Sequence, residues 1–178
     1  YVSSANGTSR IVWIDRAGHG VTSAGPVSGF LRDVRVAPDG LHASVSRLNE
    51  ADRVYDLILL DLSRQTLSQL TYGRTAFQAS WMRDQSTIVF TDVSAKGTML
   101  VRMAPLEGAA QSVVVPVGPW SVTGPDIAPD GRSLLYTRAR QDGNLDISLH
   151  TPGDSTEERS ILSTPAQETG ARFSPDGA

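Results

Sequence analysis

The sequence predicts an all-β fold: a β-propeller segment of about four blades, each built from four antiparallel strands. Three observations support this prediction: a turn sequence that returns at regular intervals, four short strand-like runs per interval, and no window with a helical period over ten residues. Four strands in about 45 residues is the organisation of a propeller blade, and it leaves almost no room for helices.

The repeat is set by a turn. Ala37-Pro38-Asp39-Gly40 returns as Ala128-Pro129-Asp130-Gly131 and again as Ser174-Pro175-Asp176-Gly177. The intervals are 91 residues (128 − 37) and 46 residues (174 − 128), so the period is 45 to 46 residues. Half of the longer interval falls at 81–85, which keeps an Asp but lacks Pro and Gly. Pro fixes φ, Asp bonds its own backbone and Gly accepts a positive φ, so the motif predicts hairpin turns. The residues with this structural role are Pro38, Asp39, Gly40, Asp84, Pro129, Asp130, Gly131, Pro175, Asp176 and Gly177.

Strand-like runs flank each turn in the same order. An apolar residue precedes the turn in every copy: Val36, Trp81, Ile127 and Phe173. Runs rich in β-branched and aromatic residues predict second strands at 43–46, 88–91 and 134–137. Third strands are expected at 11–15, 57–61, 99–102 and 146–149, and fourth strands at 66–70, 111–115 and 159–162. The nearest helical candidate, 73–82, lacks a cap and is expected to be a connection between blades.

These repeats divide the chain, 1–178, as a single propeller domain or as an arc of a larger one. Partial blades are expected at 1–29 and 166–178, and whole blades at about 30–72, 73–118 and 119–165. Either the two partial blades are halves of one blade that closes a four-bladed ring, or the chain is an arc of a six- to eight-bladed propeller. The arc is favoured, because a chain that starts and stops inside a hairpin would leave unpaired strand edges.

Composition excludes several classes of protein. The 178 residues include 16 basic and 19 acidic side chains, with a net charge of -3 and no cysteine. Hydrophobic residues make up 39%, enough for a core and too many for a disordered chain. The basic residues are scattered singly, so nucleic acid is not an expected partner. No apolar stretch reaches the length of a membrane span, so direct membrane insertion is not expected either.

No catalytic residue, metal site or cofactor is predicted. The Gly-x-Ser-x-Gly elbow of α/β-hydrolases is absent, and Gly25-Pro26-Val27-Ser28-Gly29 has the wrong spacing. His19, His42 and His150 occupy non-equivalent repeat positions, which does not suit a shared metal. Residues 142–146 are expected to form a turn, with ion binding as the open alternative, and the glycines do not form a phosphate loop.

The candidate site lies on the innermost strand of each blade, one place before the apolar anchor. Arg35, Ser80, Asp126 and Arg172 occupy this position. Because the first strand of a blade lines the central channel, these four would share one ring-like position. They form either a solvated lining with ion pairs between blades or a ligand site at the channel mouth. Arginine suits carboxylates, so an acidic peptide is the expected ligand in the second case.

The repeat also carries a family resemblance. The pattern apolar-Ser/Ala-Pro-Asp-Gly, a strand ending near Phe90 or Tyr136, and a third strand with Asp before Ile or Leu resembles the WD40-like PD40 blades of TolB-like propellers. The segments 10–18 and 67–71 are similar to the propeller region carboxy-terminal to bacterial serine/threonine kinases. The Gly-His and Trp-Asp dipeptides of true WD40 repeats are missing.

The resemblance covers essentially the whole chain and implies a function. It implies a bacterial module, periplasmic or otherwise extracytoplasmic, that binds or senses a protein or peptide and has no catalysis of its own. The alternative is an accessory propeller domain of a larger enzyme, either a prolyl-oligopeptidase-like peptidase or a receptor kinase. The remainder of a larger chain is then an expected partner.

Overall fold

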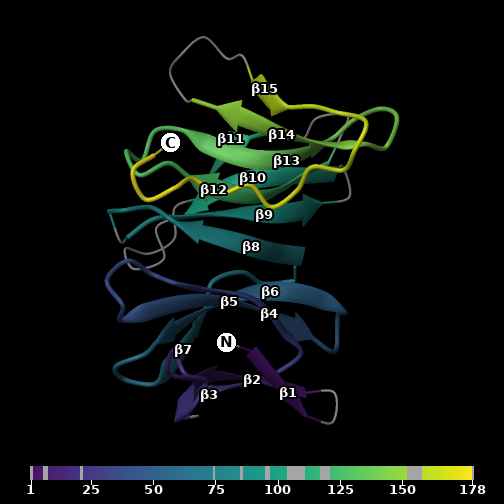
Figure 1. The fold of residues 1–178 in the computed structure, drawn as a ribbon. Helices are drawn as coiled ribbons and strands as arrows, with labels where there is room; N and C mark the ends of the chain where they lie inside the picture. The colour runs from purple at the N-terminus through teal and green to yellow at the C-terminus, as the bar shows by residue number, and fades with distance from the viewer. Residues whose placement is uncertain are drawn as a thin grey trace. The chain divides into compact units, whose positions relative to one another are not determined.

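The computed structural model describes residues 2–5, 8–20, 22–73, 75–84, 86–94, 97–103, 111–116, 121–151 and 158–177. Within these ranges the chain forms fifteen strands and no helix, which confirms the predicted all-β fold (Figure 1). The chain divides into two compact units, Tyr1–Phe77 and Gln78–Ala178.

The first unit contains two antiparallel sheets. One has three strands in the order β1 (Val2–Ala5), β2 (Thr8–Trp13) and β3 (Thr22–Gly29). The other has four strands in sequence order: β4 (Leu31–Val36), β5 (His42–Asn49), β6 (Val54–Asp61) and β7 (Thr66–Gln69).

The second unit holds two further four-stranded sheets, apart from the start of β8, which belongs to the first unit. One contains β8 (Thr75–Trp81), β9 (Ile88–Ser94), β10 (Gly97–Met103) and β11 (Gln111–Val115). The other contains β12 (Val122–Ile127), β13 (Leu134–Ala139), β14 (Leu145–His150) and β15 (Arg159–Leu162). β12 packs against β9 and β10.

Two expected elements need correction. The run 11–15 ends as a strand at Trp13, because Asp15 Oδ1 accepts hydrogen bonds from the amides of Ala17 (2.9 Å) and His19 (2.8 Å) and so closes a turn. The expected connection at 73–82 contains β8, the innermost strand of its sheet. β8 lies at one edge of its four-stranded sheet, and this position explains the weak hydrophobic alternation in its sequence.

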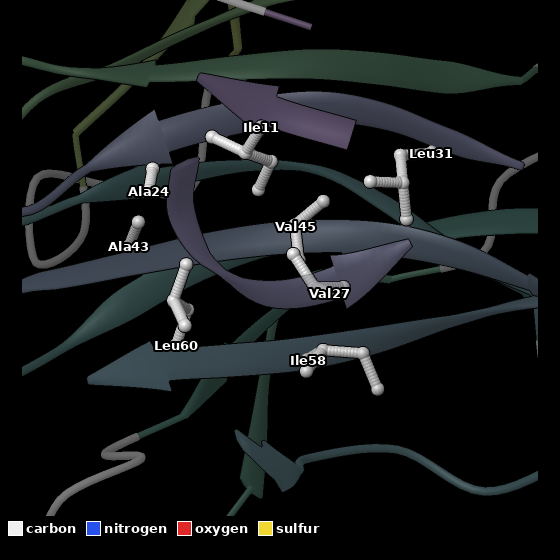
Figure 2. Close-up of a cluster of buried hydrophobic side chains, with 8 residues drawn as sticks. All are labelled: Ile11, Ala24, Val27, Leu31, Ala43, Val45, Ile58 and Leu60. Atoms are coloured by element: carbon white, nitrogen blue, oxygen red, sulfur yellow. The ribbon is translucent and has the colours of Figure 1, made fainter. Parts of the chain in front are cut away.

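The core of the first unit lies between its two sheets. Ile11, Ala24 and Val27 of the three-stranded sheet face the four-stranded sheet, as Figure 2 shows. The residues that meet them are Leu31, Ala43, Val45, Ile58 and Leu60. Val45 and Leu60 are fully buried. Alternate residues of β5 and β6 therefore supply the face that packs on the three-stranded sheet, as the two-residue period of a strand requires.

The second unit has a core of its own. It consists of Val89, Leu100, Val115, Val122, Leu134 and Tyr136. These side chains come from β9, β10 and β11 on one sheet and from β12 and β13 on the other. Val122 and Leu100 are fully buried, so the two sheets of this unit pack face to face through apolar side chains.

The repeated turns have a common geometry. The amides of Gly40, Gly131 and Gly177 donate to the carbonyls of Ala37 (3.0 Å), Ala128 (2.8 Å) and Ser174 (2.9 Å), and φ at the three glycines is 68°, 70° and 88°. Positive φ is the conformation that glycine adopts without steric cost. The turn without glycine keeps the Asp: Asp84 Oδ1 accepts the amides of Ser86 (3.0 Å) and Thr87 (2.9 Å). Gln85, which replaces the glycine, lies outside the described residues.

Candidate binding site at the ends of the innermost strands

Three of the four expected site residues meet in the second unit. Asp126, at the end of β12, is the centre of this group. Its Oδ1 accepts a hydrogen bond from Ser80 Oγ at 3.4 Å and lies 3.8 Å from Arg172 Nε. Its Oδ2 accepts the backbone amide of Phe173 at 2.8 Å. One carboxylate therefore joins β8, β12 and the segment after β15.

The burial of these groups differs. The Asp126 side chain is 17% exposed and Arg172 is 42% exposed. Arg172 also donates from Nη1 to the carbonyl of Ala171 at 2.9 Å. An ion pair at this distance and exposure contributes little to stability, about 0 to 1 kcal/mol. Arg172 can therefore leave Asp126 for another carboxylate at small cost.

Arg35 occupies the corresponding position in the first unit. It is half-buried at the end of β4, and its Nη1 donates to the carbonyl of Val34 at 3.1 Å. The structure thus brings Ser80, Asp126 and Arg172 together. The ring that would include Arg35 stays a prediction.

Sequence reasoning missed a bend that recurs once per repeat, in β4, β8 and β12 and at the matching position after β15. Asp33, Gln78, Gly124 and Gly170 have φ of 55°, 54°, 64° and 71°. Their spacing of 45, 46 and 46 residues (78 − 33, 124 − 78, 170 − 124) is that of the repeat. In β4 and β12 the bend coincides with a register shift against the next strand, which is a β-bulge.

The two bends without glycine are electrostatically unusual. Asp33 Oδ2 is buried and has no hydrogen-bond partner among the described residues; Arg32 Nε lies 3.6 Å away, beyond hydrogen-bonding range but close enough for an ion pair. Gln78 Oε1 is also buried without a partner in the part of the chain that the structure describes. Non-glycine residues at positive φ and unpaired buried polar atoms both concentrate at functional positions.

Arg32 is held over aromatic rings. Its guanidinium carbon lies 4.8 Å from the centre of the Tyr55 ring and 5.9 Å from that of Phe77. Stacking on two rings fixes the arginine beside Asp33 and supplies a cation–π contribution of about 0.5 to 1 kcal/mol at an exposed site.

A groove of about 910 Å³ opens in the second unit next to the Asp126 group. Leu135, Leu149, Ile161 and Phe173 give it apolar walls. Arg83 and Arg159 line it together with Asp130 and Asp176 of the repeated turns. Arg83 Nη2 donates to the carbonyl of Pro175 at 3.0 Å, which fixes the segment after β15 along one side. An apolar groove with charged side chains along it is suited to an extended peptide.

The turn aspartates act within their own turns. Asp39 Oδ1 accepts the amides of Leu41 (2.8 Å) and His42 (3.2 Å), and His42 Nδ1 lies 2.7 Å from Asp39 Oδ2. Burial alone would raise the pKa of Asp39, but these hydrogen bonds outweigh burial and hold the pKa below its ordinary value. Asp130 Oδ1 accepts the amide of Arg132 at 2.8 Å.

The 142–146 segment begins as a turn, in which Asp142 Oδ1 accepts the amide of Asn144 at 3.0 Å, and continues into β14 from Leu145. Across the described residues, no group of three or more His, Asp or Glu side chains is placed to hold a metal ion. Those residues also contain no helix long and apolar enough to cross a membrane.

Comparisons with solved structures show the fold. TolB from Acinetobacter baumannii matches 95% of this chain with 17% identity and a TM-score of 0.77. The putative TolB from Agrobacterium tumefaciens matches 99% of it with 18% identity and a TM-score of 0.79. A prolyl endopeptidase matches 98% with 16% identity and a TM-score of 0.60. No family model matches the sequence, and no curated protein does.

The fold is therefore that of a TolB-like β-propeller segment. The chain spans 41% and 62% of the lengths of the two TolB structures and 30% of the prolyl endopeptidase. At these identities the similarity extends to the fold alone.

Proposed function

We propose that the chain is a non-catalytic propeller module that binds or senses a protein or peptide. The observation that carries this proposal is the exposed Arg172 of the second unit, beside an apolar groove. Arg172 is 42% exposed and only loosely paired with Asp126, and its neighbour Phe173 lines the groove. A ligand with apolar and acidic side chains would place its apolar groups in the groove and a carboxylate on Arg172.

The ligand chemistry follows from arginine. Its planar guanidinium donates two parallel hydrogen bonds to a carboxylate, and such charge-assisted bonds are stronger than neutral ones. Arg35 would make the equivalent contact in the first unit. A partner without acidic groups would gain no binding energy from the arginines. Nucleic acid carries negative charge and could use them. Nucleic acid is disfavoured because the chain is acidic, with a sequence pI near 5.5.

The test is a fluorescence anisotropy titration of a labelled peptide that alternates Glu and Leu. We expect saturable binding that Arg172→Ala weakens about tenfold, the effect of losing one charged hydrogen bond. Arg35→Ala should weaken it as well. Arg64→Ala is the control, because Arg64 is 82% exposed and lies outside the proposed site. Binding that ignores both site arginines, or equal weakening by the control, would contradict the proposal.

A second candidate function is an accessory propeller of a larger enzyme, either a peptidase or a receptor kinase. The similarity to a prolyl endopeptidase over 98% of this chain supports it. The groove would then receive further propeller strands from the remainder of that chain. The flanking gene sequence decides between the two: a downstream Gly-x-Ser-x-Gly motif would indicate a peptidase, and an upstream kinase domain with a membrane span a receptor kinase.

The location proposed with this function is periplasmic or otherwise extracytoplasmic in a bacterium, without insertion into the membrane. The similarity to TolB structures supports it. Fractionation of cells that express the full gene, with the chain detected by antibody, tests this location.

A further inference from the structure

A second concave site lies in the first unit, at the end of its two sheets opposite the Pro-Asp-Gly turn. This pocket has a volume of about 350 Å³, within the range of small-molecule sites. Ser28 and Gly29, at the end of β3, form one side. The other side comes from β5, the turn after it, Asp56 of β6 and Gln69 of β7.

The strand register explains why this pocket is polar. Val45 pairs with Ile58 and Ile58 with Gln69, and the first two belong to the core between the sheets. Arg47 pairs with Asp56, one step further along the same face. Because side chains alternate along a strand, Arg47, Asp56 and Gln69 face the same way as the core. The apolar core therefore ends where the pocket begins.

Hydrogen bonds fix the inner wall of the pocket. Asp56 is 3% exposed, and its two oxygens accept Thr71 Oγ1 (3.2 Å) and Gln69 Nε2 (3.2 Å). Gln69 Nε2 also donates to the Thr71 carbonyl at 2.9 Å, and Thr71 Oγ1 accepts the Leu57 amide at 2.9 Å. These partners hold a buried carboxylate in place.

The mouth of the pocket is also ordered. Asn49 Oδ1 accepts the amide of Ala51 at 3.1 Å, and its Nδ2 donates to Asp52 at 3.0 Å. The Leu48 amide donates to the Phe30 carbonyl at 2.9 Å and so ties the β3–β4 connection to β5. Loops held in this way present binding groups without a large ordering cost.

Two opposite charges face this pocket without being paired. Arg47 is half-buried and Glu50 is exposed at the mouth. Within the described part of the chain, neither side chain has a hydrogen bond or an ion pair, with each other or with any other residue. A half-buried guanidinium without an anion loses hydration and gains nothing in return.

The same repeat position is neutralised in the second unit. Arg138 lies 91 residues after Arg47 (138 − 47), which is two repeats. Arg138 Nε donates to Glu158, its Nη2 lies 3.4 Å from the Tyr136 hydroxyl, and its guanidinium carbon lies 5.5 Å from the centre of the Tyr136 ring. Val45 stands where the second unit has Tyr136 (136 − 91). The first unit thus has the arginine but not the carboxylate that satisfies it.

We propose that this pocket binds a small zwitterion of the α-amino acid type. The carboxylate of the ligand lies on Arg47, and its ammonium group lies between Glu50 and Asp56. A simple anion is a poorer ligand because the two acidic side chains repel it. A simple amine leaves Arg47 unsatisfied. This inference is independent of the proposed partner binding, which uses other residues.

The test is an NMR titration of the ¹⁵N-labelled chain with three probes: L-alanine, acetate and methylamine. We expect L-alanine to shift the amides of 28–29 and 47–50 saturably, with the two single-charge probes binding at least tenfold more weakly. Arg47→Met should weaken L-alanine about tenfold or more, as expected for the loss of a charged hydrogen bond. Glu50→Gln should weaken L-alanine and not acetate. Arg64→Met, which removes an 82% exposed charge from the same unit, should change nothing.

Three results would overturn the inference. Equal binding of acetate and L-alanine would show an anion site and no zwitterion site. Shifts that Arg47→Met leaves unchanged would place the ligand elsewhere, and the absence of saturable shifts would show that the pocket holds only water. Arg47→Gln, of smaller volume, repeats the test should the Met variant perturb the fold, and Arg47→Lys should restore part of the affinity.

Discussion

The carboxylate of Asp126 accepts the backbone amide of Phe173 at 2.8 Å, across 47 residues of sequence. It also contacts Ser80 and Arg172, so one half-buried side chain holds three segments of the second unit. Residues 163–177, which follow β15, form no strand. The bond from the Phe173 amide to Asp126 is one of the contacts that hold this segment in place.

Asp126→Ala should therefore destabilise the chain by about 1.5 to 3 kcal/mol, the usual contribution of a hydrogen bond to a charged group. Urea unfolding measures this change, and hydrogen exchange at the Phe173 amide should accelerate. Asp142→Ala is the control, since its side chain is 57% exposed. Equal effects of the two substitutions would show that Asp126 is not a structural link.

Gly25→Ala should destabilise the first unit, because a Cβ at this position would lie 2.7 Å from Leu60 Cδ1. Overpacking of a core typically costs about 1 to 3 kcal/mol. Leu60→Ala opens a cavity and is destabilising alone, but the double variant should be more stable than the sum of the two effects predicts. A double-mutant cycle by chemical denaturation measures this coupling. Strict additivity would show that the close approach is relieved by backbone movement.

Tyr136 should ionise only well above the ordinary pKa of a tyrosine. Burial raises its pKa to about 12, Glu158 adds to the increase, and Arg138 opposes it. The neutral form is favoured in the folded chain, so the stability linked to it is complete below pH 10 and is lost as the pH rises toward 12. Ultraviolet titration of the phenolate measures this pKa, because the difference between the chain and Tyr136→Phe isolates Tyr136. A difference that titrates near the ordinary pKa of tyrosine, without unfolding, would contradict this expectation.

At the bends in the innermost strands, two substitutions should change the free energy of unfolding in opposite directions. Gly124→Ala should cost about 1 to 2 kcal/mol because alanine is strained at positive φ. A Cβ there would meet Gln78 no closer than 3.9 Å, so crowding plays no part. Gln78→Gly should be neutral or stabilising, since it relieves the same strain and removes an unpaired buried amide oxygen. Gln78→Ala keeps the backbone strain but removes the amide oxygen, so it separates the two contributions. Thermal unfolding of all three variants measures the changes in stability. Changes of the same sign for Gly124→Ala and Gln78→Gly would refute the explanation.

The sequence was sufficient to predict the repeat, the turns and the strands that follow them. Pro-Asp-Gly is strongly biased toward one local geometry, and the runs at 57–61 and 134–137 are rich in residues that strands favour. The alignment placed Ser80 on a strand, but the extent of β8 was missed, because Ala76, Ala79 and Gln78 have no strong preference for a strand. The bends at Asp33 and Gln78 were missed because neither residue is a glycine.

The role of the candidate site stays a prediction. The repeat alignment placed Ser80, Asp126 and Arg172 at equivalent positions, and the structure brings these three residues into contact. It could not show that Asp126 would accept the Phe173 amide, which depends on the path of the chain after β15. The sequence also could not predict that Arg47 is unpaired, because this depends on which side chains lie near it in the folded chain.

Gly170 bears on how a blade forms. It has a φ of 71°, like the bends in the complete sheets, although residues 163–177 form no strand in the described structure. The bend is thus present without ladder hydrogen bonds to a neighbouring strand, although Asp126 and Arg83 hold the segment on either side of Ser174. During folding, the bend and the Pro-Asp-Gly turn can form within microseconds as local events, and later strands then add in sequence to a preformed template. Because such contacts are local, we expect each blade to be able to assemble as the chain leaves the ribosome, before the next one is synthesised.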